Sequence, residues 1–285
     1  MSAETIRLLI SCPDARGIIA AVANFVAAHN GNILDADQHS DLADGEFFMR
    51  TEIEAAGFDL TPTTFATAWQ EVADRFSMRW RVHWSSQRKR MAILVSKQDH
   101  CLSDLLWRWR TGELEVDLPL VISNHNDLRS AVEICGPAFH DQPVDGTGTN
   151  DHESKMVDLL TEARVDFLVL ARYMQVLSPQ FVDRYPSQII NIHHSFLPAF
   201  AGRKPYHQAF QQGVKIIGAT SHYVTDELDQ GPIIAQSTIH VDHRDTVDDL
   251  ERKGRDLERI VLATAVRHHI EDRILVNANK TVVFD

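Results

Sequence analysis

The sequence has few cysteines and no long apolar run. Its three cysteines, Cys12, Cys101 and Cys135, are scattered, and no two of them form a C-x-x-C pair. They therefore suggest neither a zinc site nor a redox couple, and free thiols in a reducing compartment are expected. Apolar runs approaching the roughly 18 residues of a membrane-spanning helix are missing, as are the basic and apolar regions of a secretion signal. We therefore expect a cytoplasmic protein without a membrane partner.

Positive charge is also in short supply. The chain has 28 Lys and Arg against 40 Asp and Glu, a formal net charge of −12 with His neutral. It thus lacks the cationic surface that binds phosphate backbones, so nucleic acid is not an expected partner. Hydrophobic residues make up 44% of the chain and charged residues 24%, which indicates a folded globular protein. The chain has 285 residues. Because domains average about 150 residues, this length favours two domains.

The first part of the chain has the pattern of a small α/β domain. Apolar alternation predicts strands and helical periodicity predicts helices, with Gly31 ending the first helix and a turn at Asp44-Gly45. We expect strands at residues 5–10, 32–39, 46–54 and 78–84, and helices at residues 17–30 and 61–76. This βαββαβ order predicts a ferredoxin-like domain at residues 1–85, with two helices covering one face of a four-stranded sheet.

The second part of the chain begins after a short basic segment. Residues 86–90 have no periodicity and predict a linker, either a solvated connector or a docking site for an anionic substrate tail. We then expect strands at residues 91–96, 117–123, 166–170, 188–192, 216–224 and 232–240, and helices at residues 101–111, 126–135, 150–164, 178–185 and 246–272. This alternation predicts a Rossmann-like, mostly parallel α/β domain over residues 91–285, with ligands beyond the carboxyl ends of its strands.

Polar side chains follow one of these strands directly. Asn191 and His193 are two residues apart, so on an extended chain they point to the same side. An amide and an imidazole donor are suited to hold the oxyanion that forms when a carbonyl is attacked. Such chemistry also needs a carboxylate to orient water, and the later segment 221–232 offers Asp226, Glu227 and Asp229. The residues alone do not choose among these three.

A metal site is the alternative use of the histidines. His193, His194, His222 and Asp229 are all ligand types that zinc accepts. Adjacent histidines on an extended chain point to opposite faces, however, and rarely share one ion. We therefore expect no metal here.

Three motifs in order resemble the formyltransferase family that uses 10-formyltetrahydrofolate. They are Tyr173-Met174-Gln175-Val176-Leu177-Ser178-Pro179, Asn191-Ile192-His193 with Ser195-Phe196-Leu197-Pro198, and the Asp229 segment Glu227-Leu228-Asp229-Gln230-Gly231-Pro232. The resemblance covers residues 91–285, and it implies that Asn191, His193 and Asp229 form a catalytic trio.

The first domain resembles an ACT regulatory domain. The likeness rests on Cys12-Pro13-Asp14, Gly17-Ile18-Ile19, Asn32-Ile33 and Phe47-Phe48-Met49-Arg50. An ACT domain before a formyltransferase domain is similar to the arrangement of the formyltetrahydrofolate deformylases. That resemblance implies a hydrolase that converts 10-formyltetrahydrofolate to formate and tetrahydrofolate without a further cofactor, supplying formate for purine synthesis or balancing the one-carbon folate pool.

The segment after the first strand of the second domain favours water as the formyl acceptor. A transformylase that acts on a ribotide needs a glycine-rich loop there, so that backbone N–H groups can hold the phosphate. This chain instead has Ser96-Lys97-Gln98-Asp99-His100, without glycine and with an added carboxylate. A folate-dependent transferase acting on an amine, and a non-catalytic folate or amino-acid sensor, are the alternative functions.

The resemblance also implies a folate pocket. Its expected residues are Met174, Gln175, Val176, Leu177, Val224 and Asp226, with Arg203 and Lys204 as candidates for the anionic tail of the substrate. Core packing is an equal alternative for Met174 and Leu177, as is simple solvation for Arg203 and Lys204. The family commonly has Arg where this chain has Gln175, so one contact to the folate is expected to differ.

The ACT resemblance implies an amino-acid effector, with glycine and methionine as the candidates. Its expected site residues are Asp14, Arg16, Gly17, Asn32 and Ile33. Because ACT domains bind effectors between paired domains, a homo-oligomer is expected, as a dimer, tetramer or hexamer. A purely structural dimerisation domain is the alternative.

Overall fold

The chain divides into two compact units. The computed structural model describes residues 4–144, 149–198 and 205–285. Unit 1 contains residues 1–88, 271–277 and 282–285, and unit 2 contains residues 89–270 and 278–281. The C-terminal residues therefore pack with the first unit, whereas the sequence assigns all residues from 91 to 285 to one domain.

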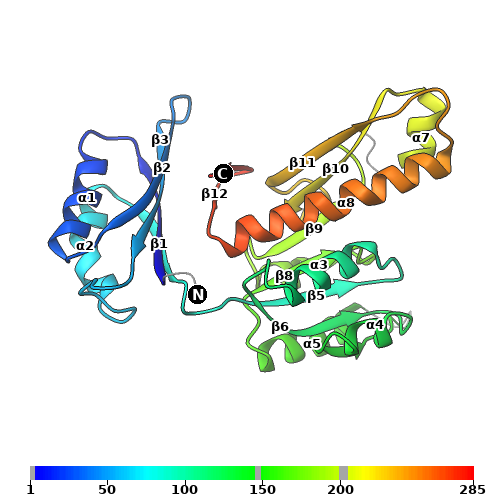
Figure 1. Ribbon diagram of the computed structural model, residues 1–285, viewed down its shortest axis with the longest axis horizontal. Helices are drawn as coiled ribbons and strands as arrows, with labels where there is room; N and C mark the ends of the chain where they lie inside the picture. Colours follow the sequence, from blue (N-terminus) through cyan, green and yellow to red (C-terminus); the bar gives the residue numbers. More distant parts are fainter. Residues whose placement is uncertain (1–3, 145–148, 199–204) are drawn as a thin grey trace. The chain divides into compact units, whose positions relative to one another are not determined.

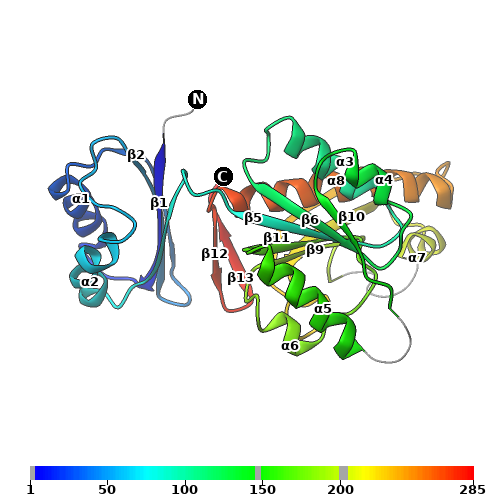
Figure 2. The same ribbon diagram turned by 90° about the horizontal axis from the view of Figure 1, so that it is seen from below.

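Unit 1 has the expected βαββαβ order. Its elements are β1 (Thr5–Pro13), α1 (Ile18–Ala28), β2 (Ile33–Asp41), β3 (Glu46–Glu54), α2 (Phe65–Arg75) and β4 (Arg79–Trp84). The antiparallel sheet has the strand order β2-β3-β1-β4, and both helices lie on one of its faces (Figure 2). Helix α2 begins at Phe65 rather than at Thr61, because the Thr61 N–H donates to Thr64 Oγ1 in a turn that precedes the helix.

The two faces of β1 are covered by different parts of the chain. Ile6, Leu8 and Ile10 pack in one core with the side chains of the two helices. On the opposite face, Leu9 and Phe48 pack against Leu275 and Phe284, in and beside the C-terminal strands β12 (Ile274–Asn277) and β13 (Lys280–Val283). The C-terminus thus closes a sheet face that the βαββαβ pattern alone leaves bare.

A buried charge ties the same C-terminal segment to unit 1. Arg50 on β3 is 1% exposed, and its guanidinium donates to the backbone carbonyls of Glu271 and Asp272. It also pairs with the carboxylates of Asp35 at 3.3 Å and Glu52 at 2.8 Å. Because a buried guanidinium needs such partners, this segment completes the polar interior of the unit.

Unit 2 is built on a seven-stranded sheet. Its elements are β5 (Arg90–Val95), α3 (His100–Arg110), β6 (Asp117–Ser123), α4 (Arg129–Glu133), β7 (Ala138–Asp141), α5 (Thr149–Glu162), β8 (Phe167–Ala171), α6 (Pro179–Val182), β9 (Ile189–His193), α7 (Pro205–Gln212), β10 (Ile216–Tyr223), β11 (Ile233–His240) and α8 (Val247–Ile270). The strand order is β11-β10-β9-β8-β5-β6-β7, in which β10 is antiparallel to both of its neighbours and the other pairings are parallel (Figure 1). The mostly parallel fold is as expected, although the short elements β7 and α7 were not predicted.

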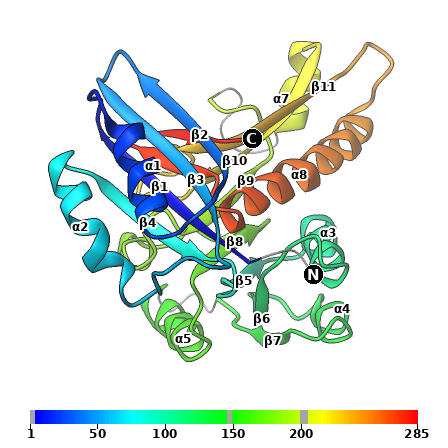
Figure 3. The same ribbon diagram turned by 60° about the vertical axis from the view of Figure 1, so that its left-hand side comes forward.

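Helices cover both faces of this sheet, with α3 and α8 on one side and α5 and α6 on the other (Figure 2). Helix α8 runs alongside α3 and also packs on β9, β10 and β11 (Figure 3). The strand order reverses between β5 and β8, and such a switch point leaves a crevice at the carboxyl ends of the strands. Among the helices of the described residues, none has the length and apolarity needed to span a bilayer.

Candidate active site

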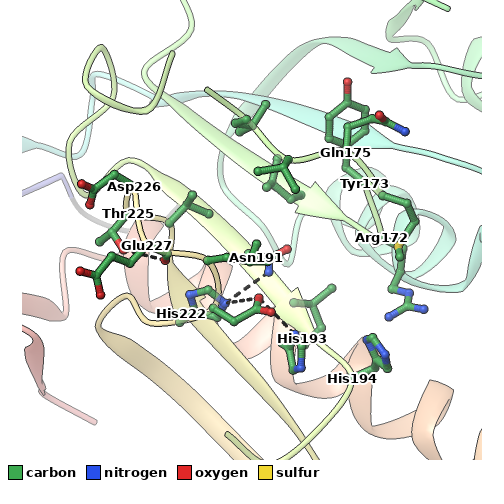
Figure 4. Close-up of a pocket in the computed structure, with 18 residues that line it drawn as sticks. Arg172, Tyr173, Gln175, Asn191, His193, His194, His222, Thr225, Asp226 and Glu227 are labelled. Carbon is green, nitrogen blue, oxygen red and sulfur yellow. Dashed lines mark hydrogen bonds and ion pairs between the residues drawn. The ribbon is translucent and has the colours of Figure 1, made fainter. Parts of the chain in front are cut away.

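A pocket of about 410 Å³ opens at the carboxyl ends of β8 and β9 (Figure 4). It is lined by Leu170, residues 172–177 after β8, residues 191–194, His222 on β10, and the loop 224–229. The pocket therefore lies beside the switch point, and it combines the Asn191-His193 pair with the acidic loop that the sequence singles out.

His193 and Asp229 form the central polar pair of the pocket. His193 Nδ1 lies 3.2 Å from Asp229 Oδ1. His193 is 6% exposed, and its Nε2 atom has no hydrogen-bond partner among the described residues. Since buried polar atoms are rarely left unpaired, this nitrogen can bond to a ligand in the pocket. The other two acidic candidates, Asp226 and Glu227, are exposed.

The carboxyl group of Asp229 is strongly perturbed. The contact with His193 holds the pKa of Asp229 well below its usual range, against the opposing effect of partial burial. Asp229 also has a left-handed backbone, with φ of 57°, which is uncommon for a residue other than glycine. This loop tolerates no side chain at Gly231, because an added Cβ would lie 1.8 Å from the Tyr223 carbonyl oxygen. A close backbone approach thus fixes the loop that carries the carboxylate.

The chain that follows His193 is held by one buried hydroxyl. The Thr220 hydroxyl donates to the Ser195 carbonyl at 2.9 Å and accepts from the Leu197 N–H at 3.0 Å. Gln236 on β11 donates to both Thr220 Oγ1 and the Leu197 carbonyl. These bonds go to backbone atoms of the Ser195–Pro198 motif. They hold the turn that follows His193, so the motif contributes through its backbone rather than its side chains.

Arg172 is a pocket residue that the sequence reasoning missed. It follows β8 directly, has φ of 62°, and donates through Nε to Gln98 Oε1 at 2.7 Å. The same nitrogen lies 3.5 Å from Glu258 Oε2 on α8. Its place just beyond a buried apolar strand is the signal that could have found it, because the same signal indicated Asn191.

The carboxylate of Glu258 is the centre of a buried polar network behind the pocket. It is 1% exposed and accepts hydrogen bonds from His100 and from the Tyr206 hydroxyl, both at 2.8 Å. Burial would raise the pKa of Glu258, but His100 and the other partners outweigh it and hold the pKa below its usual value. Nearby, burial together with Arg172 lowers the pKa of His194 to about 4, so this ring stays neutral at physiological pH.

The alternative metal site of His193, His194, His222 and Asp229 is not a set of ligand atoms that lie within mutual reach of one ion among the described residues. Among the described residues, the one set of ligand atoms with suitable mutual distances is His100, Cys101 and Glu258. His100 and Glu258 already bond each other, and burial raises the pKa of Cys101 strongly, which disfavours the thiolate that a metal binds. These residues therefore fit a hydrogen-bonded interior better than a cation.

The loop after β8 supplies apolar walls. Met174 is 61% exposed and Val176 is 69% exposed. On the loop 224–229, Leu228 is 66% exposed. Gln175 and Val224 also line the pocket, whereas Leu177, although it reaches the lining, is packed in the core beneath. Exposed apolar side chains around a pocket favour a partly apolar ligand. Arg203 and Lys204 lie outside the described residues.

The five expected effector residues occupy two separate places in unit 1. Asp14, Arg16 and Gly17 lie between the end of β1 and the start of α1. Asn32 and Ile33 lie at the start of β2, and the strand register puts this start at the opposite end of the sheet from Pro13. One copy of the chain therefore does not bring the two sets together.

Comparison with known proteins identifies the family. A family model described as formyl transferase matches residues 89–266, and one described as ACT domain matches residues 6–59. The chain is 52% identical over 280 residues to the formyltetrahydrofolate deformylase of Synechocystis sp., covering 98% of each chain. The chain belongs to the formyltetrahydrofolate deformylase family.

Solved structures agree with this assignment. A formyltetrahydrofolate deformylase from Pseudomonas syringae pv. tomato is 50% identical and has a TM-score of 0.98, covering 100% of this chain and 96% of that one. A glycinamide ribonucleotide transformylase from Symbiobacterium toebii is 28% identical with a TM-score of 0.67, covering 71% of this chain and 97% of that one. The transformylase thus matches a part of this chain, whereas the deformylase matches the whole of it.

Proposed function

We propose that the protein hydrolyses 10-formyltetrahydrofolate to formate and tetrahydrofolate at the pocket that contains Asn191, His193 and Asp229. Its place among the deformylases makes it a hydrolase of this substrate. The observation that supports the location is the pair formed by buried His193 and half-buried Asp229, which lies beside an amide donor in a partly apolar pocket. Such a set can hold both a water molecule and a developing oxyanion.

Asp229 is suited to orient the attacking water because it remains ionised across the physiological range. The water oxygen bonds to the formyl carbon while its proton passes to Asp229, directly or through a relay. Asn191 and Nε2 of His193 then donate to the oxyanion, while Nδ1 of His193 stays in contact with Asp229. Breakage of the C–N bond sends the electron pair to nitrogen, which takes up the proton that Asp229 received from water and leaves as tetrahydrofolate beside formate.

The pterin ring is proposed to lie between the two loops of the pocket. Met174 and Val176 on one side and Leu228 on the other supply exposed apolar surface, and Gln175, Val224 and Asp226 supply polar or backbone groups. Arg172 is the one Lys or Arg among the described lining residues. Arg203 and Lys204 remain our candidates for the anionic tail, because they follow the Ser195–Pro198 segment in the chain.

Water is the proposed acceptor because the chain offers no phosphate cradle after β5. Lys97, Gln98 and Asp99 stand between β5 and α3, and their side chains are exposed. A ribotide phosphate needs backbone N–H groups freed by glycine, and here it would meet the Asp99 carboxylate instead. The hydrolysis also calls for no cofactor, since the trio and water supply every group that reacts.

We further propose that unit 1 is a regulatory domain that binds an amino acid such as glycine or methionine. Because one copy separates Gly17 from Ile33, a complete site would need both sets of residues from two paired copies. This supports a homo-oligomer formed through these domains. The three free cysteines, two of them buried, fit a protein that works in the cytoplasm.

The test is formate release. The purified full-length protein is given 10-formyltetrahydrofolate without any amine, and formate and tetrahydrofolate are measured together. The proposal expects both products in equal amounts, with no acceleration when glycinamide ribonucleotide is added. Formate that appears only with an added amine, or a formylated amine in its place, would show that the protein is a transferase.

A further inference from the structure

His222 contacts two of the three proposed catalytic side chains. Its Nε2 atom lies 3.2 Å from Asn191 Nδ2 and 3.7 Å from Asp229 Oδ1 (Figure 4). Its other ring nitrogen, Nδ1, lies 2.9 Å from the Tyr223 carbonyl oxygen. The ring is 2% exposed, so water cannot substitute for these partners.

The partners fix which ring nitrogen carries the hydrogen. A backbone carbonyl only accepts, so Nδ1 of His222 must donate to Tyr223. The amide nitrogen of Asn191 only donates, so Nε2 of His222 must accept. Both conditions hold in one form of the ring, the neutral tautomer with hydrogen on Nδ1. The distance from Nε2 to Asp229 is too long for a hydrogen bond, which leaves the lone pair to Asn191.

This hydrogen bond orients the Asn191 amide. An Asn side chain can turn over by 180°, which exchanges a donor for an acceptor at the same place. Because Nε2 of His222 accepts a hydrogen bond, the NH₂ group of Asn191 stays on the side of the amide that faces His222. Its second N–H is then left for another partner. The other orientation would set the carbonyl oxygen of Asn191 against the lone pair of His222, and the pocket would lose an oxyanion donor.

The sheet places His222 for this task. His222 on β10 is directly opposite Asn191 on β9 in the antiparallel register, and the next pair of that face joins Thr220 to His193. Side chains opposite each other in such a pair lie on the same face. The pairing of β10 with β11 is irregular at Ser221 and His222, a kind of distortion that re-aims side chains beside active sites.

We propose that His222 is a positioning residue for the hydrolysis: as a neutral acceptor it orients the Asn191 amide so that an N–H faces the oxyanion. The inference rests on the proposed function and adds a fourth side chain to its machinery. His222 does not exchange a proton with the substrate in this role, and it acts through Asn191.

Two substitutions separate this role from a structural one. His222→Gln puts a side-chain oxygen near the position of Nε2, so it keeps an acceptor for Asn191 and loses the donor to Tyr223. His222→Asn keeps a donor near the position of Nδ1 and loses the acceptor. Loss of one oriented oxyanion donor costs about 10²–10³ in rate. We therefore expect kcat to fall about 10²-fold in His222→Asn with KM little changed, and less than about tenfold in His222→Gln.

The experiment measures kcat and KM for formate release, binding of tetrahydrofolate, and thermal unfolding for both variants. His207→Gln, at an exposed site on α7, is the control and should match the wild type. Long-range ¹H–¹⁵N spectra, assigned by the signal lost in His222→Gln, should show hydrogen on Nδ1 and none on Nε2.

Higher activity in His222→Asn than in His222→Gln would overturn the proposal, because the tether to Tyr223 would then be what matters. Equal losses in both variants, or a ring protonated at both nitrogens, would also overturn it. If the wild type itself releases no formate, the proposed function fails. If the wild type is active and the variants rank otherwise than expected, only the role of His222 fails.

Discussion

Phe284→Ala is expected to destabilise unit 1, although Phe284 is the second residue from the C-terminus. Phe284 is 6% exposed and packs with Leu275 against Leu9 and Phe48. Replacing a buried Phe by Ala costs about 3–5 kcal/mol. Because the neighbouring side chains can relax into part of the space, we expect the lower limit, about 3 kcal/mol.

That loss should be visible as a lower melting temperature of one unit. For a domain of this size each kcal/mol shifts Tm by about 4–8 °C, so the unit 1 transition should fall by roughly 12–24 °C. Hydrogen exchange on a temperature ramp reads the units separately, with β1 and β3 reporting on unit 1 and β8 and β9 on unit 2. Val283→Ala is the matched control, since Val283 is half-buried and does not belong to this cluster; it should cost less than about 1 kcal/mol.

The reasoning would be refuted by unchanged exchange in β1 and β3 of the Phe284→Ala variant. It would equally be refuted if Val283→Ala lowered the transition as much, because a nonspecific effect of the C-terminus would then explain both. Loss of protection first in β8 and β9 would place the segment with the other unit.

Three further predictions concern unit 2. Glu258→Gln removes the charge from a buried network and should lower the free energy of unfolding in urea by about 3 kcal/mol. Glu251→Gln on the same helix is the control and should lower it by less than about 0.5 kcal/mol. Because the folded pKa of Glu258 lies below its usual value, this stabilisation is complete above the unfolded pKa and is lost as pH falls through the folded pKa, so wild type and variant should converge in acid. Gly231→Ala should lower kcat at least about 10²-fold, since the added Cβ would displace the loop that carries Asp229, and turnover at the wild-type rate would contradict the close approach seen here. Asp229→Asn should lower kcat/KM throughout the range from about pH 5 to pH 9, because the pKa of Asp229 lies well below that window and its carboxylate is ionised across all of it; wild-type kcat/KM at any pH in the window would contradict the role of the carboxylate.

Local patterns in the sequence predict much of the fold and the centre of the site. Strand periodicity followed by polar residues is a short-range signal, and it located Asn191 and His193 at the end of β9. The glycine-containing acidic loop was found in the same way, although only the folded chain distinguishes the half-buried Asp229 from the exposed Asp226 and Glu227.

Contacts between distant segments were beyond local patterns. His222 meets Asn191 only because β10 pairs with β9 in one register, and a shift of one residue would turn His222 to the other face. Arg172 also follows a buried apolar strand, but its partners Gln98 and Glu258 come from distant segments of the chain. The C-terminal residues 274–284 are largely apolar, but their local pattern does not say which sheet they cover, and only the folded chain shows that they pack on unit 1.

The central claim is that Asn191 and His193 stabilise the oxyanion formed when water, held by Asp229, attacks the formyl group. Its most direct test is single-turnover formation of formate by Asn191→Ala, with tetrahydrofolate binding measured on the same preparation. The account predicts a fall of about 10²–10³ in the rate of formate formation while tetrahydrofolate binds as it does to the wild type. Formate released at the wild-type rate would contradict the account.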